Sequence, residues 1–313
     1  WKDYPGISGL TFSLNWQDGL ADIDMKSHKL HIYADKWLKK SVYFDSVMGA
    51  VKVQYADKKS LSVETKALRI WNDDLTLQLD GVFKHFDSGK TDTNLLISLE
   101  DVQVNTWKKY IPLQILEPDL RKWAAPAFVN GIITEGKIEL VGDLADFPYD
   151  KQPEKGRFKM DLTVENTQLH FAEGWPNIED VNGSIHGLGN DLTINSNHGS
   201  IAGFKFVNVT TKIKRLMITK PVLTVNGSLT GTTNQGLEFL RNSPLKQRFS
   251  RAVDGVVAKG NSDLELHILV PLTNVNSTQA KGNVSFKNSE LRHQSIQDVG
   301  ITKINGLLNF NND

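Results

Sequence analysis

The chain contains no cysteine among its 313 residues, which excludes disulfide bonds, thiolate metal sites and a cysteine nucleophile. No run of 18 apolar residues occurs, so the sequence predicts no transmembrane helix. Neither sign of charge is in excess, because 36 Lys and Arg balance 36 Asp and Glu. No long basic run is interleaved with aromatic residues, so nucleic acid is not an expected partner.

Most of the sequence alternates apolar and polar residues with a period of two, which is typical of strands whose two faces differ. Asp18-Gly19 is the strongest hairpin signal. A phase slip at Glu165–Thr167 predicts a bulge inside a long strand. The expected strands cover residues 9–14, 22–33, 47–55, 61–71, 75–86, 94–104, 136–141, 157–171, 177–186, 192–196, 201–218, 222–230, 256–270, 280–291 and 299–310.

Residues 107–150 break this alternation and predict a helix, a strand and an exit loop. Pro118 suits a first helical turn, and Pro126 and Gly131 predict that the helix ends near Val129. One apolar stripe at helical spacing holds Leu120, Trp123, Ala124, Ala127 and Phe128. A second, short helical pair is expected near residues 234–253, with Ser243 as cap and Pro244 in a first turn. Residues 36–41 are expected to form a helical turn or a loop.

No arrangement in the sequence indicates catalysis. None of the eight histidines has the spacing of a metal motif, and His28 and His31 would lie on opposite faces of a strand. The acidic pairs fall in expected turns, where acidic residues are common. We therefore expect no catalytic residue, no metal and no cofactor, and we do not expect an enzyme.

The expected helices are too few and too short to cover the apolar side of so many strands. Either two sheets pack together as a closed sandwich, or one sheet curls around a groove that a ligand completes. Alternation alone favours the sandwich slightly, because strands of a closed core and strands of a groove have the same period.

Four stretches carry a family resemblance. They are the run LEPDLRKWAAPAFVNGIITEGKIELVGDLADFPYD that ends at Asp150, Gly174-Trp175-Pro176, Ser243–Leu245, and LELHILVPLTN at 264–274. Together they resemble the large AsmA-like proteins of the YhdP type, relatives of TamB in the bacterial envelope. The resemblance covers most of the chain in the order of the family.

This resemblance implies a mainly β fold, a long antiparallel meander curled into an open apolar groove with a few short helices. It also implies a periplasmic bridge between the inner and outer membranes of Gram-negative bacteria that passes phospholipid along the groove. The candidates for the groove lining are Leu75, Leu77, Leu79, Ile97, Leu99, Ile138, Leu140, Phe158, Met160, Leu162 and Val164. Leu120, Trp123 and Phe128 are candidates for a lid or an end cap.

We expect a meander of repeat units over residues 1–105, a helical insertion over 106–130, and further groove repeats over 131–313. The chain is expected to be a piece of a longer protein whose inner-membrane anchor lies outside it. Phospholipids are the expected partners, and contacts with both membranes and with envelope proteins would come from other parts. The alternative is a scaffold for envelope assembly with an ordinary closed β core.

Overall fold

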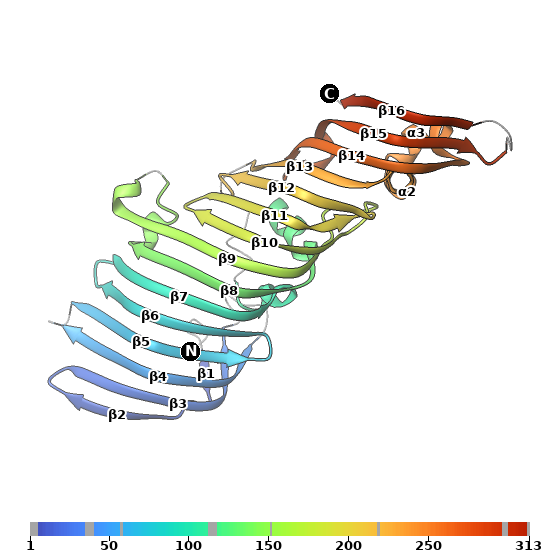
Figure 1. Cartoon of the computed structure of the whole chain (residues 1–313). Coiled ribbons are helices and arrows are strands. Elements are labelled where there is room, and N and C mark those ends of the chain that lie inside the picture. The colour runs from blue at the N-terminus through green and yellow to red at the C-terminus, as the bar shows by residue number, and fades with distance from the viewer. Residues whose placement is uncertain are drawn as a thin grey trace. The chain divides into compact units, whose positions relative to one another are not determined.

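The computed structural model describes residues 6–34, 41–56, 59–111, 118–150, 152–217, 220–295 and 300–311. The turn or loop expected at residues 36–41 lies outside this part of the chain except for Ser41. Sixteen strands of the described residues form one antiparallel sheet in the order β1, then β3 through β16, with β2 also paired to β3 (Figure 1). Because this path does not close on itself, the expected mainly β, open fold is confirmed.

The strands are longer than usual. Their bounds are β1 (Gly6–Ser8), β2 (Phe12–Gln17), β3 (Leu20–Tyr33), β4 (Val42–Ala56), β5 (Ser60–Asn72), β6 (Leu75–Phe86), β7 (Thr91–Gln103), β8 (Phe128–Gly142), β9 (Gly156–Leu169), β10 (Ile178–Leu188), β11 (Asp191–Ile201), β12 (Phe204–Lys214), β13 (Val222–Thr232), β14 (Val256–Pro271), β15 (Gln279–His293) and β16 (Gly300–Asn311). Asp18 and Gly19 form the tight turn between β2 and β3 that the sequence predicts, with φ of 49° and 81°.

The helical segments are short and lie between strands. They are η1 (Val104–Lys109), α1 (Pro118–Ala127), η3 (Leu144–Asp146), η4 (Pro153–Lys155), α2 (Thr233–Arg241), α3 (Lys246–Val253) and η5 (Val275–Ser277). We call the strand ends that carry η1, α1, α2 and α3 the helix rim, and the opposite ends of the same strands the turn rim.

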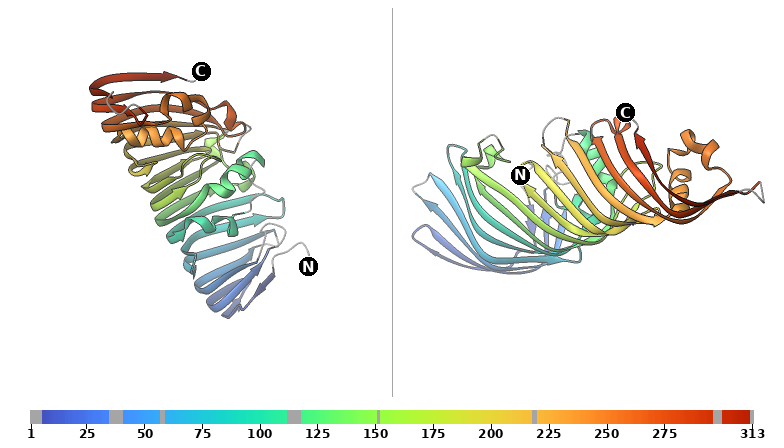
Figure 2. Two further views of the ribbon diagram at one scale, coloured as in Figure 1. Left: turned by 90° about the vertical axis from the view of Figure 1, so that its right-hand side faces the viewer. Right: turned by 45° about the horizontal axis from the view of Figure 1, so that its top comes forward.

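The chain divides into two compact units. Unit 1 contains residues 1–116, 132–163 and 185–191, and unit 2 contains residues 117–131, 164–184 and 192–313. In each unit the strands are bent rather than flat, as the right-hand view of Figure 2 shows.

Most long strands contain one residue with positive φ, where the strand bends. Asn166 of β9, at φ 50°, confirms the bulge that the phase slip predicts. Gly81 of β6 has φ 127°, and a side chain there would meet the backbone oxygen of Asn94, so only glycine fits. Bulges of this kind increase the local bend and twist of a strand and leave backbone groups without a ladder partner.

Buried hydroxyl groups supply hydrogen bonds beside these bends. In unit 1 the Ser46 Oγ donates to Ser27 O at 3.0 Å, and the Thr65 Oγ1 donates to Ala50 O at 2.9 Å. In unit 2 the Ser196 Oγ donates to Asn182 O at 2.7 Å. A short hydroxyl side chain on an otherwise apolar face therefore satisfies backbone oxygens of the neighbouring strand.

Three local predictions are wrong. The helix ends at Ala127 with Pro126 still inside it, and Phe128 begins β8, so Phe128 is not part of the helical stripe. Gly131 has φ 132° but lies within β8, where its α-carbon packs against Thr167.

The other two errors concern unit 2. The strand expected over residues 201–218 is two strands, because Ala202 and Gly203 form a turn between β11 and β12. The short helical pair expected near residues 234–253 is confirmed as α2 and α3, and Thr232 and Gln235 form a capping box for α2. The second error concerns Ser243 and Pro244, which lie between the two helices instead of capping and opening the second one.

Candidate functional site

The apolar rows of β6, β7 and β8 lie on one face of unit 1. In the register of these strands, Leu77 is opposite Leu99, Leu79 is opposite Ile97, and Ile97 is opposite Ile138. Residues that are opposite each other in antiparallel strands point to the same face. The structure therefore brings these five lining candidates together, and Leu140 joins them through its partner Leu95.

The next strand extends this face, which we call the apolar face. Leu162 of β9 lies over Gly136 together with Leu99, so the space above the glycine is filled by its neighbours. Phe158 lies in edge-to-face contact with Phe147, with ring centroids 5.2 Å apart. Met160 lies between these two positions on the same strand. Val164 is buried and belongs to unit 2.

Exposure separates the lining candidates into two groups. Leu75 and Val164 are buried, each 5% exposed. The other nine are half-buried: Leu77, Leu79, Ile97, Leu99, Ile138, Leu140, Phe158, Met160 and Leu162. Large apolar side chains in a closed core are usually fully buried. Most of this face therefore keeps contact with its surroundings while presenting hydrocarbon.

The helix rim of unit 1 is filled. Leu75 belongs there to a buried cluster with Leu30, Val42, Phe44, Val47, Leu68 and Val102. Tyr110, just after η1, packs against this cluster with its ring 6.1 Å from that of Phe44. The part of the apolar face next to η1 is therefore closed by the protein's own side chains.

A polar latch holds Tyr110 in place. Its hydroxyl donates to Asp74 Oδ2 at 2.7 Å and accepts from Asn72 Nδ2 at 2.8 Å, while Lys109 Nζ lies 2.6 Å from the same Asp74 oxygen. Burial would raise the pKa of Asp74, but the hydrogen bonds from Lys109 and Tyr110 outweigh it and lower that pKa. Burial, reinforced by the bond to Asp74, raises the pKa of Tyr110.

A second aromatic cap lies at the turn rim, between β8 and β9. Tyr149 is 3% exposed, and its ring lies against the α-carbons of Gly142 and Gly156, where no side chain competes for the space. Phe147 of the same loop contacts Phe158. Sequence reasoning missed both caps, because each depends on a contact between a loop and a distant strand.

The apolar face also reaches the edge of the sheet. Phe12, Leu14 and Trp16 of β2 are opposite Met25, Ile23 and Ala21 of β3, and all three are exposed, Trp16 by 62%. The prediction missed these residues, although the run FSLNW alternates clearly and contains the signal.

Unit 2 has a comparable face that the list of candidates did not include. Leu229 is opposite Leu264, which is opposite Val284, and Val284 is opposite Leu308. The adjacent row contains Gly227, Leu266, Gly282 and Phe310 in the same order of strands. The ring of Phe310 lies over Gly282, so side chains lie flat against the sheet in this row.

Helix α1 packs within unit 2. Leu120, Ala124 and Ala127 are buried, and the Trp123 indole N–H donates to Phe171 O at 2.9 Å. The ring of Phe171 contacts Trp175, which in turn contacts Phe239 of α2, at centroid distances of 5.9 and 5.8 Å. Two of the three lid or cap candidates therefore lie on a helix that is anchored to the helix rim.

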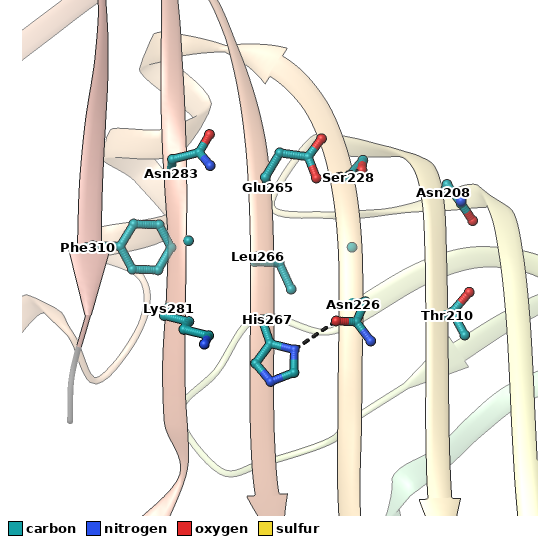
Figure 3. A pocket seen from close by; sticks show the side chains of 12 residues that line it. Asn208, Thr210, Asn226, Ser228, Glu265, Leu266, His267, Lys281, Asn283 and Phe310 are labelled. Atoms are coloured by element: carbon teal, nitrogen blue, oxygen red, sulfur yellow. Dashed lines mark hydrogen bonds between the residues drawn. The ribbon is translucent and has the colours of Figure 1, made fainter.

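The strands of unit 2 line a hollow of about 500 Å³, which lies over β12 to β16 and is shown in Figure 3. A second hollow, over β2 to β4, includes the apolar Leu14, Ile23 and Val51 in its lining. His267 Nδ1 lies 2.7 Å from Asn226 Oδ1, and Ser228 Oγ donates to Glu265 at 2.8 Å. Leu266 and Phe310 also belong to the lining, beside these polar side chains. The hydrogen bonds link neighbouring strands, as expected for a solvated sheet face.

Among the described residues, no group of three or more His, Asp or Glu side chains is arranged to hold a metal ion. The helices in the same part of the chain are also too short and too polar to cross a bilayer.

Comparison with known proteins gives one match. The family model described as YhdP protein matches residues 1–313 of this chain. No curated protein and no solved structure matches it.

Proposed function

The chain belongs to the YhdP protein family, and we propose that it binds phospholipid acyl chains on its apolar face and supports phospholipid transport between the inner and outer membranes. Membership of the family indicates a bacterial envelope protein related to lipid transport. We add three points to this as our proposal: the binding of acyl chains, the periplasmic location and the two membranes served.

The half-buried state of the apolar rows carries this proposal. Of the nine half-buried apolar side chains on β6 to β9, Leu77, Leu79 and Leu99 pack against the buried cluster at the helix rim. The other six are half-buried without belonging to that cluster: Ile97, Ile138, Leu140, Phe158, Met160 and Leu162. A contiguous apolar surface that retains contact with its surroundings is typical of a binding site for an apolar ligand. The aromatic caps at the two rims leave the middle of the strands as the accessible part. The anchoring of α1 by Trp123 supports an end cap at the helix rim.

The energetics suit such a surface. Moving an acyl chain of roughly 16 methylenes through water would cost about 13 kcal/mol, at about 0.8 kcal/mol for each methylene. A continuous apolar track removes most of this barrier, because the chain exchanges one hydrocarbon contact for another. Movement of a lipid along this face needs no catalytic residue, since no covalent bond changes.

A scaffold for envelope assembly is the second candidate function. The buried cluster around Phe44 and Leu68, closed by Tyr110, favours it, because that end of unit 1 is an ordinary core. If the half-buried rows are covered by protein partners instead of lipid, the scaffold function is correct.

Charged substitutions on the two faces distinguish these functions. The triple variant Leu77→Glu, Leu140→Glu and Leu162→Glu should lose the phospholipid that copurifies with the wild type, because three carboxylates cannot be buried against acyl chains. Native mass spectrometry measures the bound lipid. The matched control is Asn94→Glu, Ser98→Glu and Thr163→Glu, three polar-face positions on β7 and β9, which should keep it.

Circular dichroism must show that both triple variants remain folded. A wild-type protein that carries no phospholipid after purification from membranes would contradict the lipid-binding proposal. Equal lipid content in the two variants would show that the wrong face has been assigned.

A further inference from the structure

The charge of this neutral chain is strongly segregated. Residues 192–253 contain nine of its 36 Lys and Arg but one of its 36 Asp and Glu, so this segment has a net charge of +8 and the rest of the chain −8. The segment extends from β11 to the end of α3, within unit 2. Such an asymmetry indicates an anionic partner for this part of the chain.

The cations gather at both ends of β13. At its turn rim, the connection from β12 contains Lys214, Arg215 and Lys220, all exposed. At its helix rim, Lys246 begins α3 and is exposed, and the sequence of that helix also contains Arg248 and Arg251. No acidic residue occurs from 239 to 253. Lys214, Arg215 and Lys220 at one end of β13 and Lys246 at the other are therefore exposed cations at the strand ends.

Arg241 does not contribute to the exposed positive charge at the ends of β13. Its guanidinium pairs with Glu238 at 2.7 Å and donates to the backbone oxygens of Val253 and Val256. These bonds tie α2 to the end of α3 and the start of β14, so Arg241 has a structural role.

The middle of β13 is apolar between these ends. Val225 is opposite Ile268 and Leu229 is opposite Leu264, on either side of Gly227. An exposed apolar side chain also borders the cation of α3, because Phe249 follows Lys246 by three residues and is 39% exposed. A hydrocarbon surface that ends in basic side chains matches the boundary between acyl chain and headgroup.

We propose that Lys220 at one rim and Lys246 at the other bind the phosphate of anionic phospholipids whose acyl chains lie on the apolar face of unit 2. This inference rests on the proposed function and adds a headgroup preference to it. The lysines act through exposed ammonium groups, which form charge-assisted hydrogen bonds with phosphate oxygens.

The probes are dioctanoyl-phosphatidylglycerol and dioctanoyl-phosphatidylcholine, each kept below the concentration at which it forms micelles. The wild-type chain should bind the anionic lipid about fivefold to tenfold more tightly, and this preference should weaken as salt is added. In the variant Lys220→Glu and Lys246→Glu the preference should disappear, while binding of phosphatidylcholine stays unchanged.

The matched control reverses two exposed lysines of unit 1, in the variant Lys90→Glu and Lys137→Glu. Its net charge changes equally, so it should retain the preference if the position of the charge matters. Loss of the preference in both variants, or in neither, overturns the proposal. Absence of binding by either lipid to the wild type contradicts the proposed function instead.

Two further binding measurements identify the source of the phosphate. Inorganic phosphate should compete weakly, and a full effect of phosphate without any lipid preference would indicate a free-anion site and overturn the proposal. Vesicles of phosphatidylglycerol test for docking on a membrane surface. If the lysine variant loses vesicle binding but keeps its preference among monomeric lipids, the cations dock the chain on a membrane and do not hold transported lipid.

Discussion

Unit 1 closes the helix-rim end of its bent sheet with a contiguous cluster of large apolar side chains, whereas unit 2 has a cluster of three hydrogen-bonded hydroxyl groups at the helix-rim end of its strands. In unit 1, Phe44, Leu68 and Tyr110 close a contiguous cluster. In unit 2, the hydroxyl of Thr233 lies 2.9 Å from that of Ser262 and 2.7 Å from that of Ser289, and all three residues are buried. A bend in a strand can thus be supported either by hydrocarbon packing or by satisfied polar groups.

The number of glycines in the apolar rows is a second difference between the two units. In unit 1 the row of Ile70, Leu77 and Leu99 contains one glycine, Gly136, which Leu162 covers. In unit 2 Gly227 and Gly282 interrupt the row of Leu266 and Phe310. The row of unit 2 therefore holds fewer large apolar side chains than the row of unit 1.

The largest expected difference in unfolding free energy comes from truncating one phenylalanine to alanine in each unit. Phe44→Ala removes a side chain that is 7% exposed at the centre of the cluster, and should cost about 3–5 kcal/mol of unfolding free energy. Phe310→Ala removes a half-buried ring from the terminal strand β16, and should cost about 1 kcal/mol. Denaturant unfolding of both variants measures the difference. Equal losses would contradict the contrast between a filled and a thin face.

Acid should weaken the Tyr110 latch of unit 1 without a matching effect on the hydroxyl network around Thr233 in unit 2. This loss of stability should be smaller than the loss caused by truncating Phe44. Because the pKa of Asp74 is lowered in the folded chain, its contribution is complete above the ordinary carboxyl pKa of about 4 and is lost as the pH falls through the lowered value. Loss of the carboxylate should weaken the Tyr110 latch by about 1 kcal/mol. The hydroxyls around Thr233 carry no charge, so this network has no carboxylate to titrate.

Hydrogen exchange between pH 7 and pH 3, corrected for intrinsic rates, measures this difference. The amides of Tyr110 and Ile111, which bond to Trp107 O, should lose protection in acid. In the variant Asp74→Asn they should be less protected at pH 7 and show little further change. A wild-type profile that does not depend on pH would show that the carboxylate does not hold the latch.

Much of the fold was predictable, because alternation with period two is a local signal. The strands of unit 1 and the turn at Asp18 follow from it, and the phase slip before Thr167 locates one bulge. The bulges at Ala67 and Asp101 were overlooked, although the apolar residues change phase at both positions. The phase changes from Leu61 and Val63 to Leu68 and Ile70, and from Ile97 and Leu99 to Val102 and Val104. The local pattern does not give the partner strand or the register.

The candidate site was predictable in its composition but not in its limits. Alternation groups Leu77, Leu79 and Leu99, and the register confirms that they share a face. The caps formed by Tyr110 and Tyr149 depend on loops that fold back over distant strands. Their sequences contain aromatic residues but no indication of where these will pack. Contact of the candidates with lipid stays a prediction.

Photo-crosslinking in cells tests the central claim most directly. A benzoylphenylalanine at Leu79 in unit 1 or Val284 in unit 2 should form adducts with phospholipid, whereas the same group at Gln78 or Ser285, one residue away on the polar face, should not. Adducts with protein alone at Leu79 and Val284, or equal lipid adducts at all four positions, would contradict an apolar face that carries lipid.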